Sequence, residues 1–138
     1  MSASVAGTGE YLLLFRGTGW SDGLSPEQMQ VEAGKFMSWF ERLKMEGACK
    51  GGQPLQREGK IVSGKGGRMI ADGPFAESKE AIGGYFLIVA DTLEQAVEIA
   101  RGCPALERGM TVEVRPVAEA CPDMEAARKS LEATTVAA

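Results

Sequence analysis

The chain has 138 residues, with 15 lysines and arginines against 19 aspartates and glutamates, and its formal net charge is −4. This length suits a single domain, and the acidic pI near 5.0 disfavours direct binding to nucleic acid, which requires a basic face. The absence of histidine excludes imidazole acid–base catalysis, His-dependent nucleophiles and His-ligated metals. A hydrophobic fraction of 44% is enough for a core, and no apolar run is long enough to span a membrane.

The three cysteines, Cys49, Cys103 and Cys121, are widely spaced and form no CxxC pair. This spacing predicts reduced thiols, with neither a disulfide framework nor a metal site. The N-terminus lacks the basic segment and apolar run of a secretory signal. We therefore expect a cytoplasmic protein without a metal or another cofactor.

The N-terminal part of the chain predicts a tail, a strand and a loop. Residues 1–9 are small and polar and predict a flexible tail. Residues 10–16 read EYLLLFR, which is apolar on both faces and predicts a buried strand. Residues 17–24 contain three glycines and predict a loop.

A helix is predicted to begin after Ser25, because Pro26 suits the first helical position and Gln28 completes a capping box. We expect this helix to end near Gly47. Its apolar residues recur at helical spacing: Met29, Ala33, Phe36, Met37, Phe40 and Leu43.

A hairpin is predicted in the glycine-rich segment that follows, with one strand at 55–62, a turn at 64–67 and a return strand at 68–71. Residues 59–65 read GKIVSGK, which is the beginning of a phosphate-binding loop. Two glycines follow in place of the required Ser or Thr and helix. We therefore interpret this motif as a hairpin turn and expect no nucleotide there.

The second half of the chain predicts a strand, a helix and another strand. Residues 84–90 read GYFLIVA and suit a central strand. Residues 91–94 can cap a helix that ends at 102–104. Residues 110–117 alternate, with Met110, Val112 and Val114 directed inward. The helix is expected to pack through Leu93, Ala96, Val97 and Ala100.

This order predicts an α+β fold, a ferredoxin-like subunit with a βαβ-hairpin-βαβ arrangement. We expect a tail at 1–9, the domain at 10–118 and a C-terminal helix or tail at 119–138. Two helices cover only one face of such a sheet, although two of its strands are apolar on both faces. A second copy that packs sheet against sheet would cover the other face, so we expect a homodimer that forms a dimeric α/β barrel.

The segment DGPFAESKE at 72–80, followed by GGYFLI at 83–88, resembles the signature of the DGPF branch of YCII-related proteins. The opening leucine-rich strand, the Ser25-Pro26-Glu27 helix start and the closing VEVRPV at 112–117 agree with it. The resemblance implies a dimeric α/β barrel in a bacterial cytosol. It also implies either an enzyme without an assigned reaction or a protein that acts beside extracytoplasmic-function sigma factors.

The chain departs from this family at the place where the resemblance implies a catalytic His–Asp pair. The Asp of that pair stands in an Asp-Pro dipeptide after the second helix, where this sequence has Cys103-Pro104. Because histidine is absent as well, neither member of the pair is carried over. Cys103 as a nucleophile is disfavoured by its place at a helix C-terminus, so we interpret it as structural.

Asp72 is the leading candidate for a site, as a base or polar anchor that a rigid turn projects into a cleft. The competing interpretation is an ordinary turn, in which Asp72 bonds its own backbone and Phe75 fills the core. Glu77 is a second candidate carboxylate, since paired carboxylates can divide acid and base roles, and Lys79 would line the same cleft. The competing interpretation of these two residues is a solvated loop or the cap of a short helical turn at 78–80.

Trp20 and Phe75 are candidate apolar walls for a bound molecule. Arg16, Glu113 and Arg115 lie on strands and are expected to form an ion-pair network, with Arg115 as a candidate contact for an acidic ligand. Two functional hypotheses follow: a cofactor-free small-molecule binding protein or enzyme, and a non-catalytic partner of a sigma factor. Neither involves a membrane or direct binding to nucleic acid.

Overall fold

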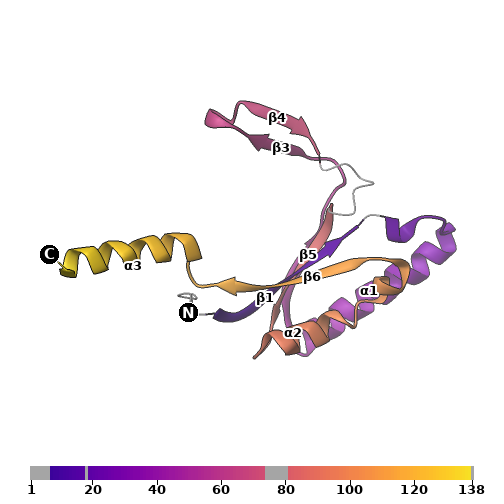
Figure 1. Cartoon of the computed structure of the whole chain (residues 1–138). Coiled ribbons are helices and arrows are strands. Elements are labelled where there is room, and N and C mark those ends of the chain that lie inside the picture. Colours follow the sequence, from indigo (N-terminus) through magenta and orange to yellow (C-terminus); the bar gives the residue numbers. More distant parts are fainter. Residues whose placement is uncertain (1–6, 18, 74–80, 138) are drawn as a thin grey trace.

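The computed structural model describes residues 7–17, 19–73 and 81–137 (Figure 1). A four-stranded antiparallel sheet has the order β2-β5-β1-β6, and β3 and β4 form a separate two-stranded sheet. The strands are β1 (Gly7–Arg16), β2 (Cys49–Pro54), β3 (Lys60–Ser63), β4 (Met69–Asp72), β5 (Ile82–Val89) and β6 (Thr111–Ala118). The α-helices are α1 (Pro26–Met45), α2 (Leu93–Ala100) and α3 (Pro122–Ala137). The 3₁₀ helices are η1 (Gly19–Ser21), η2 (Lys65–Gly67) and η3 (Pro104–Arg108).

Two βαβ units build the main sheet, β1-α1-β2 and β5-α2-β6, and the hairpin of β3 and β4 is inserted between them. The observed strand order agrees with the predicted ferredoxin-like arrangement. Helices α1 and α2 lie together against one face of the sheet, whereas β3–β4 and α3 project away from the helices (Figure 1). The chain therefore has a two-layer body and two projecting segments.

The ends of the first two helices follow from local hydrogen bonding. Ser25 Oγ accepts from the backbone N–H of Gln28 at 3.1 Å, and the Ser25 N–H donates to Gln28 Oε1 at 2.9 Å, which confirms the capping box. Gly47, just past the end of α1, has a φ of 76°, a conformation that favours glycine. At α2, Thr92 Oγ1 accepts from the N–H of Gln95 at 3.1 Å.

The core lies between the sheet and these two helices. Leu13 of β1 and Ile88 of β5 are fully buried at its centre. Beside them, the Phe15 ring meets Phe86 edge-on at a centroid distance of 4.7 Å and Phe36 at 5.3 Å. Each such ring pair contributes about 0.5–1.5 kcal/mol beyond area burial. Phe36, Trp39 and Phe40 are thus core residues, as their helical spacing predicts.

Strand β1 begins at Gly7, three residues before the predicted start at position 10. Gly7 pairs with Ala118, and the Thr8 hydroxyl donates to the Val117 carbonyl at 3.2 Å and accepts from the Glu10 N–H. Gly7 and Thr8, which were predicted to belong to a polar tail, therefore bond to β6, a strand that is distant in sequence.

The predicted βαβ-hairpin-βαβ arrangement requires a strand after the first helix, but the sequence did not locate it, because the centre of β2 is the Gly51-Gly52 pair and glycine weakens a strand. A Cβ atom at Gly52 would lie 2.3 Å from the Tyr85 carbonyl oxygen. The glycine lets β2 approach β5 closely, which is a tertiary requirement rather than a local preference. The hairpin is confirmed, but its first strand begins at Lys60 rather than at position 55.

Two residues expected on the inner faces of helices are exposed, Met37 and Leu93. Met37 follows Phe36 by one residue, about 100° further around α1, so that only Phe36 reaches the core. Leu93 opens α2, one turn before the buried Ala96. The inward placement of Met110, Val112 and Val114 is confirmed.

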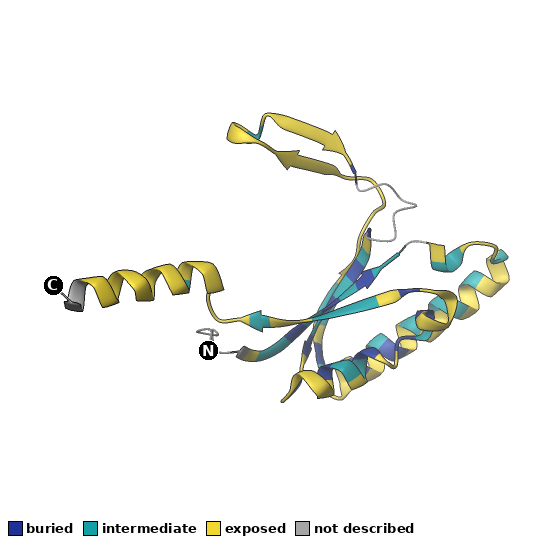
Figure 2. Ribbon diagram, viewed as in Figure 1, coloured by how far each residue is buried: buried dark blue, intermediate teal, exposed yellow. Residues whose placement is uncertain are grey.

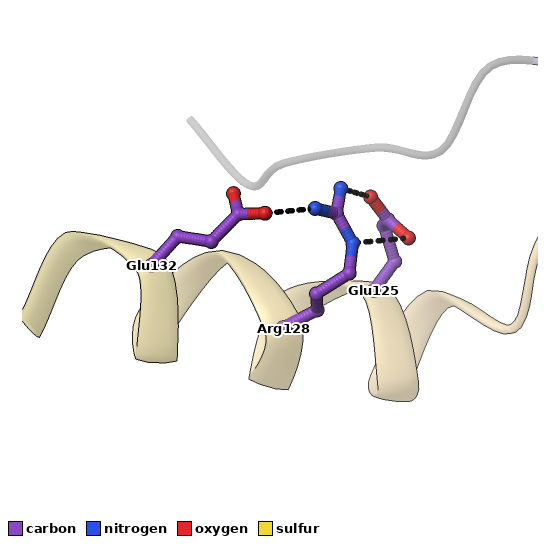
Figure 3. Close-up of polar contacts among 3 residues, drawn as sticks. All are labelled: Glu125, Arg128 and Glu132. Carbon is purple, nitrogen blue, oxygen red and sulfur yellow. Dashed lines mark hydrogen bonds and ion pairs between the residues drawn. The ribbon is translucent and has the colours of Figure 1, made fainter. Parts of the chain in front are cut away.

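Helix α3 lies within the segment expected to be a C-terminal helix or tail, and it is stabilised along one side by charge. Figure 3 shows Arg128 between Glu125 and Glu132, with its Nε donating to Glu125 Oε2 at 3.3 Å and its other nitrogens bonded to both carboxylates. Hydrogen bonding to Arg128 lowers the pKa of Glu125 from its ordinary value. Among the helices of the described residues, none is both long and apolar enough to cross a membrane.

The approach of β2 to β5 predicts that Gly52→Ala will destabilise the protein, by about 1–3 kcal/mol, since backbone must move to admit a methyl group. Gly34→Ala is the matched control, because Gly34 lies in α1 with open space around it. It should stabilise the protein by about 0.5–1 kcal/mol. Urea unfolding at one fixed protein concentration measures both, and equal midpoints for the two variants would contradict the packing.

The lowered pKa of Glu125 predicts that α3 loses helicity in acid. The Glu125 carboxylate binds a proton more tightly when α3 is unfolded than when it is helical. Ionised Glu125 therefore stabilises the helix fully above pH 4.5, and this stabilisation is lost as the pH falls through the lowered pKa. Backbone ¹³C shifts of residues 122–137 between pH 7 and pH 2 report the change. Glu125→Gln should give reduced helicity already at pH 7 and a smaller change with pH.

Candidate functional site

The face of the sheet opposite the helices is apolar at its centre. Leu12 and Leu14 of β1 alternate with the buried Leu13, and they pair with Leu87 and Tyr85 of β5. These side chains are half-buried by their neighbours in the sheet, and helices α1 and α2 lie on the other side (Figure 2). In the described part of the chain, this face is left without a covering layer (Figure 1).

A row of charge borders this apolar centre on β6. Glu113 Oε1 lies 3.1 Å from Arg16 Nη1, and Glu113 Oε2 lies 3.5 Å from Arg115 Nη1. Cross-strand pairing places Glu113 opposite Leu14 and Arg115 opposite Leu12. The ion-pair network expected from the sequence is therefore present, and Arg115 is its most exposed member.

Asp72 lies at the foot of a projecting segment that we call the arm, residues 60–72, which comprises β3, η2 and β4. Its carboxylate is ion-paired with the Lys60 ammonium across the hairpin, and the side chain is 77% exposed. A hydrogen bond of 3.1 Å from the Gly73 N–H to the Gly59 carbonyl closes the foot. Asp72 therefore presents an acceptor beside a donor, with solvent access to both.

Trp20 belongs to a different part of the fold. It lies in η1 and packs against the core, and its carbonyl accepts from Arg108 Nε of η3 at 2.7 Å. Arg108 also lines a shallow depression of about 270 Å³ at the start of α1. The other residues of this depression are Leu24, Glu27, Gln28, Val31 and Glu32.

The structure does not bring the described candidates together within one chain. Asp72 pairs with Lys60, Trp20 is held by η3, and Arg115 stands on β6, the sheet edge opposite β2. These two edges are separated by three strand spacings, about 14 Å. Phe75, Glu77 and Lys79 lie outside the described residues, as does the second half of the DGPF turn.

The two buried thiols are poorly suited to nucleophilic chemistry. Burial raises the pKa of Cys103 and of Cys49, despite hydrogen bonds from backbone groups that act in the opposite direction. Cys103 contacts Met110 in the core, with an S–S distance of 3.9 Å between the thiol and the thioether. This supports the structural interpretation of Cys103. Within the described ranges, no cluster of acidic or thiol side chains could hold a metal ion.

Comparison with known proteins identifies a family whose model matches the chain. The model of the YCII-related domain matches residues 26–121, well over half of the chain. The chain belongs to the YCII-related family. No curated protein matches this YCII-related chain.

One similar solved structure is 5-chloro-2-hydroxyhydroquinone dehydrochlorinase (TftG) from Burkholderia phenoliruptrix AC1100, in complex with 2,5-dihydroxybenzoquinone. It is 15% identical in sequence, with a TM-score of 0.43. The match covers 80% of the YCII-related chain and 95% of the other chain.

Sequence reasoning did not select two polar residues that the structure places near the open face. Tyr85 of β5 pairs with Leu14 on one side and with Gln53 of β2 on the other. Side chains alternate along a strand, and Phe86 is buried on the helix side. Alternation along 84–90 was therefore enough to place Tyr85 on the opposite, open face. Gln53 could not be assigned, since the sequence did not locate the residues of β2.

Proposed function

We propose that this YCII-related protein works in the cytoplasm as a homodimer that binds a small molecule near the foot of the arm. Asp72 is the polar centre of this site. Trp20, Phe75, Lys79 and Arg115 are the other proposed contacts, with Glu77 as a second carboxylate. The observation that carries the proposal is the Asp72–Lys60 pair, exposed at the foot of the arm beside the DGPF turn.

Dimerisation is supported by the open face of the main sheet. Leu12, Leu14 and Leu87 are adjacent across two strands, which makes a continuous apolar centre rather than scattered residues. Apolar area removed from water contributes about 25 cal/mol per Å² to the free energy of association. In a two-fold symmetric dimer the same patch is buried on both subunits, so each residue contributes twice. Packing sheet against sheet would give the dimeric α/β barrel that the family resemblance implies.

Small-molecule binding is supported by the chemistry of the pair. The Asp72 carboxylate accepts hydrogen bonds and the Lys60 ammonium donates them, so together they can hold a polar group that does both. Any turnover at this site would be proton transfer by the carboxylates of Asp72 and Glu77, because the chain has no histidine and the thiols of Cys49 and Cys103 have raised pKa values. The proposal requires no cofactor.

A role as an accessory protein for an extracytoplasmic-function sigma factor is the second candidate. The observation in its favour is α3, which projects from the body with Met124 and Leu131 exposed (Figure 2). A helix of this kind can pack against a helix of another protein. Capture experiments with the full chain that recover no sigma factor would count against this role.

We predict a mass of about twice 14.6 kDa in sedimentation at micromolar concentration. Leu87→Asp places a charge at the centre of the open face and should give folded monomers. Leu106→Asp changes an exposed leucine of η3 and serves as the control, which should remain dimeric. A monomeric wild-type protein would refute the dimer.

The ligand site predicts that Asp72→Asn abolishes small-molecule binding, because the substitution removes the negative charge beside Lys60 with little change in shape. A fragment library observed by ligand-detected NMR supplies the probe. Asp123→Asn, which neutralises an exposed carboxylate of α3, is the control and should retain every wild-type hit. Equal fragment binding by both variants would show that Asp72 does not contribute to ligand binding.

A further inference from the structure

We infer that the arm of each subunit crosses to the second copy of the chain and packs against it. This inference rests on the proposed dimer and adds which segment crosses between the subunits. Four observations support it: the exposure of the arm, its reach, its charge and the accessible area of the chain.

The arm carries apolar side chains on both of its faces. Val62 pairs with Ile70 on one face, and Ile61 and Met69 lie on the other. All four are large hydrophobic residues that stay exposed, with Val62 at 63% and Ile70 at 65% (Figure 2). An isolated two-stranded hairpin is marginally stable in water, so this arm requires a surface to pack on.

The arm projects away from the helices, toward the side that a second copy would occupy in a sheet-to-sheet dimer (Figure 1). Its strands have four residues each, which corresponds to about 13 Å. Two sheets that pack face to face are about 10 Å apart. The arm is thus long enough to span the gap and reach the partner.

Charge favours a second copy of this chain as the partner. The arm contains Lys60, Lys65 and Arg68 against the single Asp72, a formal charge of +2. The whole chain carries −4, so the remainder carries −6. A basic arm and an acidic body attract each other between copies and orient the encounter.

The accessible area of the chain is large for its mass. The accessible surface of the chain is 9822 Å², a total that also counts the residues outside the described ranges. A folded monomer of 14.6 kDa exposes about 6,900 Å². The chain therefore exposes about 2,900 Å² more than a compact monomer of its mass, as expected when the arm and α3 stand away from the body.

The test uses Val62→Asp in the full-length protein, with Val31→Asp as the matched control. Val31 has a similar exposure, 58%, but lies on α1, behind the sheet. Sedimentation velocity over a dilution series should show the dimer dissociation constant raised at least about tenfold by Val62→Asp, since both arms are affected, and unchanged by Val31→Asp. Ile70→Asp, on the same face of the arm, should repeat the effect, and circular dichroism verifies that each variant is folded.

Crosslinking distinguishes a failure of the arm inference from a failure of the proposed dimer. Dimers assembled from ¹⁴N- and ¹⁵N-labelled chains are treated with a lysine-reactive crosslinker, and crosslinks from Lys65 at the tip of the arm should join unlike labels. A stable wild-type dimer in which Val62→Asp has no effect and Lys65 crosslinks join like labels only would overturn the arm inference alone. A wild-type protein that is monomeric at micromolar concentration would overturn the proposed dimer and the arm inference together.

Discussion

The sheet carries apolar side chains on both faces, and the chain supplies only two helices to cover them. On the helix side, Leu13, Phe15, Phe86 and Ile88 pack against α1 and α2 in a dense aromatic core. On the other side, Leu12, Leu14 and Leu87 have no covering layer among the described elements. The proposed dimer and its ligand site depend on that asymmetry, because whatever covers the second face also surrounds the polar groups at its border.

Within one chain, those polar groups lie toward opposite edges of the sheet. Arg16, Glu113 and Arg115 occupy one border of the open face, whereas Asp72 and Lys60 stand at the foot of the arm, which leaves the sheet from β2 at the opposite edge. A ligand site within a single chain would have to bridge the full width of the sheet. In the proposed dimer, a second subunit would supply another arm and another charged row at the open face.

The candidate site could be predicted only in part from the sequence. Asp72 and the hairpin before it were recognisable from turn chemistry, and the ion pairs of Glu113 followed from strand alternation. The partner of Asp72 was not, because Lys60 is twelve residues away and is brought opposite only by the hairpin register. Tyr85 and Gln53 likewise gained significance from the pairing of β5 with β2, which spans some thirty residues of chain.

Local patterns determined the capped helices, the apolar strands, the hairpin and the absence of imidazole chemistry, because each depends on residues that are close in sequence. The tertiary structure decided the remainder. It drew a glycine-rich segment into the sheet as β2, since Gly52 can lie against the Tyr85 carbonyl where a side chain cannot. It extended β1 back to Gly7 through bonds to β6, and it left the arm and α3 away from the body. These features depend on contacts between distant segments, whose geometry no local pattern encodes.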